Sequence, residues 1–140
     1  MDKEILCIPE KDDKKRFILG QPGTKNLLTI ALNPSTADEE KLDPTTRNVR
    51  FLSEKYGCDG WYMLNLSAAR TPKPELLATT QNEDWHTENL KQIEGLLYKG
   101  NIEKVLLSWG NNINTRNYLK TNALDILKLI QTINKPCYAL

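Results

Sequence analysis

Three apolar runs recur along the chain, and stretches with helical spacing lie between and after them. The runs are Leu27–Leu32, Trp61–Leu64 and Val105–Ser108. They are apolar on both faces of an extended chain, which is typical of buried strands in a parallel sheet. The other stretches place apolar residues every three or four positions, which predicts helices over residues 44–56, 83–98 and 115–132. This alternation predicts an α/β fold with three layers, α/β/α, and a mainly parallel central sheet.

Short apolar segments near the N-terminus add to this core. Ile5–Ile8 and Arg16–Leu19 flank a charged turn, which predicts an N-terminal β-hairpin. Cys137–Leu140 predicts a last short strand. We expect a single α/β domain over the 140 residues, with the hairpin in residues 1–22 and the core in residues 27–140.

The composition narrows the class of protein. A charged fraction of 26% and a hydrophobic fraction of 39% fit a soluble globular fold. A net charge of +1 means that nucleic-acid binding would need a local basic patch. Three scattered cysteines without a CxxC pair argue against disulfides and a zinc site, and the single histidine, His86, excludes a multi-histidine metal site. We predict a reduced, cytoplasmic protein without a cofactor, metal or membrane segment, and a monomer by default.

Polar residues gather where the three predicted strands end, in the segments Asn33–Asp38, Asn65–Arg70 and Ser108–Asn112. Because ligands of open α/β sheets bind beyond the carboxyl ends of the strands, we expect a binding site at this edge. The predicted site residues are Asn33, Pro34, Ser35, Thr36, Asp38, Arg47, Asn65, Arg70, Trp109 and Gly110.

Each candidate has a functional and a structural interpretation, and the sequence leaves both open. The Asn33–Asp38 turn can hold a water, a phosphate or a base edge, or its side chains can bond their own backbone. Asn65 can pair with a nucleobase edge or cap neighbouring backbone. Arg47 and Arg70 can hold phosphate or lie in solvent. Trp109 can stack on a base or pack in the core.

Two titratable residues near predicted helix starts are assigned structural roles. Asp43 directly precedes Pro44, which favours a helix cap over a base or a ligand. His86 follows Trp85 near a helix start and is expected to be structural or exposed. The sequence contains nothing similar to a Ser-His-Asp triad or a phosphate-binding glycine loop.

The motifs resemble those of the domain-of-unknown-function family 1643, a family of bacterial and phage proteins. The similar elements are Leu32–Asp38, Asp43–Thr45 with Arg47, Asn65 with Arg70, and Trp109-Gly110. The resemblance runs from about Leu27 to the C-terminus, and the N-terminal hairpin fits the family's usual opening. It implies no particular activity.

The order of elements is also remotely similar to the uracil-DNA glycosylase superfamily, which implies a uracil-DNA-glycosylase-like fold. Ala31–Pro34 stands where that superfamily has a GxNP-type loop that positions water. Asn65 and Trp109-Gly110 each follow a strand, as the superfamily's base-reading asparagine and its Trp-Gly pair do. Glycosylases carry a His-Pro-Ser-type loop after the last strand, whereas this chain stops at Leu140, as a truncated or a naturally short form would. This departure disfavours glycosylase catalysis.

Two functions follow from these observations. The favoured function is a nucleotide or nucleic-acid binding module with a polar pocket at the C-terminal strand ends. The alternative is a base- or nucleotide-directed, glycosylase-like hydrolase. In that enzyme Asn33, the candidate catalytic residue, would position water, Asn65 would recognise the base, and Arg47 or Arg70 would hold phosphate. The binding module is favoured because the sequence offers no convincing general base.

Overall fold

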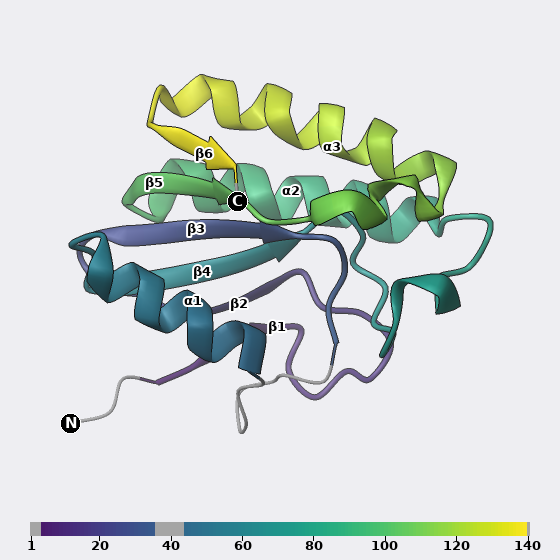
Figure 1. Cartoon of the computed structure of the whole chain (residues 1–140), viewed down its shortest axis with the longest axis horizontal. Helices are drawn as coiled ribbons and strands as arrows, with labels where there is room; N and C mark the ends of the chain where they lie inside the picture. The colour runs from purple at the N-terminus through teal and green to yellow at the C-terminus, as the bar shows by residue number, and fades with distance from the viewer. Residues whose placement is uncertain (1–3, 36–43, 140) are drawn as a thin grey trace.

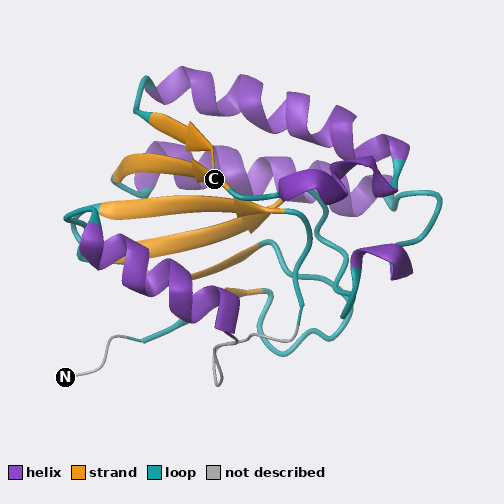
Figure 2. Ribbon diagram, in the orientation of Figure 1, coloured by secondary structure: helices purple, strands orange, loops and turns teal. Residues whose placement is uncertain are grey.

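The computed structural model describes residues 4–35 and 44–139, and all its strands belong to one six-stranded sheet (Figures 1 and 2). The strands are β1 (Leu6–Ile8), β2 (Ile18–Gln21), β3 (Asn26–Ala31), β4 (Gly60–Asn65), β5 (Ile102–Leu107) and β6 (Cys137–Ala139). Their order across the sheet is β1-β2-β4-β3-β5-β6. The three apolar runs therefore form the adjacent central strands β4, β3 and β5, which are parallel as predicted.

The sheet is mixed, so the expectation of a mainly parallel sheet is wrong. Strand β2 runs antiparallel to both of its neighbours, β1 and β4, whereas β3 to β6 pair in parallel. The reason is that the predicted hairpin joins the main sheet directly. Gly20 of β2 permits this close pairing, because a Cβ atom there would lie 2.6 Å from the carbonyl oxygen of Trp61.

The helices agree with the predicted periodicity. They are α1 (Pro44–Lys55), α2 (Glu83–Lys99) and α3 (Asn117–Ile130), with short 3₁₀ helices at Pro74–Leu76, Gly110–Thr115 and Gln131–Ile133. Helix α2 begins where the Asn82 side chain accepts a hydrogen bond from the backbone of Trp85, and it ends at Gly100. No helix within the described residues is long and apolar enough to cross a membrane.

Helices cover both faces of the sheet, as Figure 1 shows. One face packs against α2 and α3 through side chains that alternate along the strands, such as Leu28, Ile30, Tyr62, Leu64 and Val105. The other face packs with Val49 of α1 through Leu27, Trp61, Met63 and Leu106. Because successive side chains of a strand point to opposite faces, the register assigns each residue at a strand end to the α1 side or to the α2/α3 side.

Candidate functional site

The ends of β3, β4 and β5 lie at the same edge of the sheet, where their arrowheads point in Figure 2. The pairing of β3 with β4 continues past both strand ends. The backbone of Leu66 donates to Ala31, and the backbone of Ser67 donates to Leu32. The loops after β3 and β4, which carry most of the predicted site residues, therefore begin side by side.

Asn33 joins these two loops through its amide nitrogen. Its Nδ2 donates to Thr71 Oγ1 at 2.7 Å, to the Ala69 carbonyl at 3.1 Å and to the Pro34 carbonyl at 3.3 Å. The backbone of Thr71 in turn donates to the Pro34 carbonyl. The amide nitrogen of Asn33 thus stabilises the loop conformation, in line with its structural interpretation.

Arg70 connects the same loop to the N-terminal hairpin. Its Nε donates to the Ser35 carbonyl at 2.9 Å, and its Nη1 donates to the Asp12 carbonyl at 2.7 Å. The structure therefore brings Asn33, Ser35 and Arg70 into one hydrogen-bonded network. In this network the guanidinium group binds backbone carbonyls of the protein.

Asn65 differs from Asn33, although each follows an apolar run of the sequence. Its side chain is fully buried, and within the described residues neither Oδ1 nor Nδ2 has a hydrogen-bond partner. The buried hydroxyl of Thr29 on β3 also lacks a partner there. Thr29 is opposite Met63 and Ala31 is opposite Asn65 in the register, so the two polar side chains are diagonal neighbours on the α1 side.

Two buried asparagines that the sequence did not single out hold the end of β4 from the α2/α3 side. Asn89 of α2 donates its Nδ2 to the carbonyl of Asn65, and Asn122 of α3 donates its Nδ2 to the carbonyl of Leu66, each at 3.0 Å. Asn122 also exchanges hydrogen bonds with Gln81. In the sequence, each of them is recognisable as an asparagine at a core position of an amphipathic helix.

The remaining predicted site residues take less specific positions. Arg47 is exposed on α1, and Trp109 is partly buried against the core. Gly110 adopts a positive φ of 66° where a 3₁₀ helix begins. Thr36, Asp38 and the proposed cap Asp43 lie outside the described residues, so their predicted roles stay predictions.

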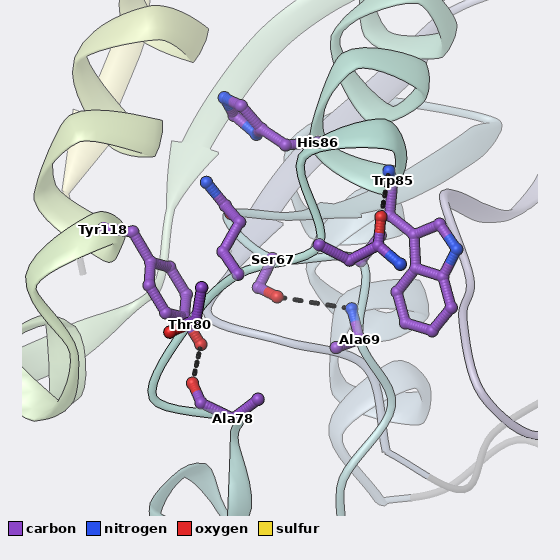
Figure 3. Close-up of a pocket in the computed structure, with 10 residues that line it drawn as sticks. Ser67, Ala69, Ala78, Thr80, Trp85, His86 and Tyr118 are labelled. Carbon is purple, nitrogen blue, oxygen red and sulfur yellow. Dashed lines mark hydrogen bonds between the residues drawn. The ribbon is translucent and has the colours of Figure 1, made fainter.

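A pocket of about 260 Å³ lies on the α2/α3 side of the β4 end, and Figure 3 shows the residues around it. His86 lines this pocket and is hydrogen-bonded to Asp125 of α3, with 3.0 Å between Nε2 and Oδ2. This histidine is therefore structural in part, as expected, but it also contributes to a pocket that the sequence did not reveal.

The tip of the N-terminal hairpin is ordered by Asp12. The carboxylate accepts hydrogen bonds from Lys15 Nζ at 2.9 Å and from the backbone of Lys14 and Lys15. These bonds lower the pKa of Asp12 from 3.8 to about 2, the Lys15 side chain contributing most. Lys15 Nζ also lies 5.5 Å from the ring centroid of Trp85, which lines the pocket.

The lowered pKa gives a testable dependence of stability on pH. Because the folded pKa of Asp12 lies below the unfolded value, its stabilisation is present above about pH 3.8 and is lost as the pH falls through about 2. Asp12→Asn should therefore lower the melting temperature at pH 7 and leave it unchanged near pH 2. The cost should be at most about 1 kcal/mol, because solvent screens this partly exposed pair. Asp13→Asn, at the exposed neighbouring position, is the control and should have no effect at either pH.

Within residues 4–35 and 44–139, no group of three His, Cys, Asp or Glu side chains could hold a metal ion.

A family model described as "Protein of unknown function (DUF1643)" matches residues 16–140. No curated protein and no solved structure matches the chain, so the expected likeness to uracil-DNA glycosylases stays a prediction. The matched residues begin just before β2 and include α1, α2, α3 and the last strand, β6. The chain therefore belongs to the domain-of-unknown-function family 1643.

Proposed function

We propose that this protein is a nucleotide or nucleic-acid binding module whose polar pocket lies at the C-terminal strand ends. The observation that carries the proposal is the Asn65 side chain, which is fully buried and without a hydrogen-bond partner within the described residues. Leaving a buried polar group unpaired costs about 1–3 kcal/mol. A fold that retains such an amide needs a compensating partner, and a ligand or a bound water can supply one.

The chemistry of the amide indicates which ligand would satisfy it. Asn65 offers one acceptor, Oδ1, and donors on Nδ2, side by side. The complementary group therefore carries a donor next to an acceptor, as nucleobase edges do. A phosphate or a carboxylate only accepts hydrogen bonds, so it would leave Oδ1 unpaired. The hydroxyl of Thr29, diagonal to Asn65 on the same face, can add one more bond to such a ligand.

The surroundings of Asn65 favour recognition of an uncharged group. Its side of the sheet is mainly apolar, with Leu27, Trp61, Met63 and Leu106 packed around Val49 of α1. Moving a charged ligand from water into an apolar environment costs much more free energy of desolvation than moving a neutral base edge there. Hydrogen bonds formed there are also stronger than in water.

The hydrolase alternative has less support. Its candidate catalytic residue, Asn33, uses its amide nitrogen to hold the loop that carries Thr71, which leaves only the amide oxygen to hold a water. Arg70, one of its candidate phosphate ligands, binds two backbone carbonyls. Binding without reaction is therefore the function that we propose.

An NMR titration tests this proposal. The ¹⁵N-labelled chain is titrated with each of the four common deoxynucleoside monophosphates and with a short single-stranded DNA. We expect at least one of them to shift the amide signals around Asn65. Asn65→Leu, which keeps the branched shape and the number of side-chain heavy atoms but cannot hydrogen-bond, should weaken that binding about tenfold or more, the equivalent of one lost hydrogen bond to a buried polar group.

The matched control is Asn48→Leu, which changes an exposed asparagine on α1 and should leave binding unchanged. The proposal is wrong if none of the ligands shifts these signals. It is also wrong if Asn65→Leu binds them as tightly as the unmodified chain does.

A further inference from the structure

A second site lies on the other side of the β4 end. The pocket of about 260 Å³ is formed by the loop after β4, the segment before α2, and the first turns of α2 and α3. It is on the α2/α3 side, because Leu64 and Leu66 of the same chain segment belong to that core. The Asn65 side chain lies on the opposite side. The pocket is therefore separate from the amide that carries the proposed function.

The walls of this pocket suit a flat ring. The aromatic side chains of Trp85 and Tyr118 line it, together with the small side chains of Ala68, Ala69 and Ala78. Figure 3 shows the two aromatic rings on opposite sides of the group of lining residues. Aromatic rings bind other rings by stacking or edge contacts. Pockets for drug-sized ligands measure roughly 300–1,000 Å³, so a volume of about 260 Å³ fits a compound of one or two fused rings.

Both aromatic walls are held in place before any ligand binds. The hydroxyl of Tyr118 donates to the carbonyl of Ala78 at 2.6 Å. The backbone of Trp85 is capped by Asn82, and Lys15 lies over its indole ring. A pocket whose walls are already ordered loses little conformational entropy when a ligand enters.

His86 supplies a directional polar group. Its side chain is only 10% exposed, and its Nε2 is bonded to a carboxylate oxygen of Asp125, which can only accept a hydrogen bond when ionised. The proton of the neutral imidazole therefore resides on Nε2, which leaves Nδ1 as an acceptor. This Nδ1 is buried and has no hydrogen-bond partner within the described residues.

The described residues that line the pocket include no Asp, Glu, Lys or Arg. A charged ligand would therefore enter without a counter-charge on the walls, whereas an uncharged ring would not need one. Ser67 adds a hydroxyl that already accepts the backbone N–H of Ala69 and can still donate.

We propose that this pocket binds a small, uncharged, planar heteroaromatic compound, which packs against Trp85 and Tyr118 and donates a ring N–H to Nδ1 of His86. The Asp125 carboxylate fixes the tautomer that accepts this bond. The ligand class is thus defined by three features: a flat shape, the absence of charge, and an N–H donor on the ring.

Indole and benzofuran form a matched pair of probes, because they have nearly the same shape and only indole carries an N–H. In a ¹H–¹⁵N titration of the full chain, indole should shift the signals of Ala69, Trp85 and His86. Benzofuran should bind about tenfold more weakly, because one hydrogen bond to a buried acceptor is missing. No shift of these signals with indole, or equal binding of both probes, would overturn the proposal.

Two variants make the test specific. Trp85→Ala should weaken indole binding about tenfold, whereas Tyr98→Ala, which removes an aromatic ring that is 87% exposed elsewhere on α2, should not change it. His86→Phe preserves a flat ring without nitrogen and should make the affinities for indole and benzofuran equal. A preference for indole that persists in His86→Phe would refute the role of Nδ1. Asn65→Leu should leave indole binding intact, so this proposal can fail or succeed independently of the nucleotide site.

Discussion

Replacing Arg70 with methionine should lower the free energy of unfolding by about 3 kcal/mol. The guanidinium group donates to two carbonyls, of Ser35 and Asp12, that belong to different segments of the chain. Hydrogen bonds to a charged group contribute about 1.5–3 kcal/mol each, and partial exposure reduces their sum. Methionine keeps much of the aliphatic packing, so the loss reports mainly on the hydrogen bonds. Urea denaturation of both proteins measures the difference.

Arg70→Lys separates the charge from the geometry of the donors. Lysine keeps the positive charge but lacks the planar fork that reaches two acceptors at once, so it should recover less than half of the loss. Lys73→Met, at an exposed position in the same loop, is the control and should change the free energy of unfolding little. An Arg70→Met variant that is as stable as the unmodified chain but no longer binds nucleotides would show that Arg70 is a phosphate ligand.

Asn122→Leu should lower the free energy of unfolding by about 2 kcal/mol. The substitution removes the donor to the Leu66 carbonyl and the paired amide of Gln81, in a place where Asn122 is only 1% exposed. Leucine has the same number of side-chain heavy atoms and the same branching, so no cavity adds to this cost. The expected loss is that of one buried carbonyl and one amide left without a partner.

The same substitution at an exposed asparagine is the control for this prediction. Asn111→Leu, at an exposed position outside α3, should stay within about 0.5 kcal/mol of the unmodified chain, as most surface substitutions do. Equal stability of Asn122→Leu and Asn111→Leu would contradict the role of Asn122 in holding the end of β4.

The central strands and the helices could be predicted from the sequence because burial on both faces and amphipathic spacing are local patterns. Leu27–Leu32 and Trp61–Leu64 carry apolar side chains on both faces of the extended chain, and they became adjacent parallel strands. The place of the hairpin could not be predicted in the same way. Its pairing with β4 depends on close backbone contact at Gly20, which is a property of two segments far apart in the sequence.

The candidate site could be predicted only in outline. The sequence places Asn33 and Asn65 in the same context, directly after a buried strand. Their difference arises because the loop with Ala69 and Thr71 returns beside Asn33, whereas the Asn65 side chain points to the α1 side of the sheet, where no described group bonds it. Likewise, the partner of His86 is Asp125, which lies 39 residues later and is brought close by the packing of α2 against α3.

The most direct test of the central claim, that Asn65 is kept for a ligand, is urea denaturation of the unmodified chain and of Asn65→Leu. Each is measured alone and with the deoxynucleoside monophosphate that binds the unmodified chain, present at about 100 times its dissociation constant. Without ligand, Asn65→Leu should be at least as stable as the unmodified chain, because it removes an unpaired buried amide. With ligand, the unmodified chain should gain about 2.7 kcal/mol and Asn65→Leu much less. A variant that loses 1 kcal/mol or more without ligand, or that gains as much from the nucleotide, would contradict the account.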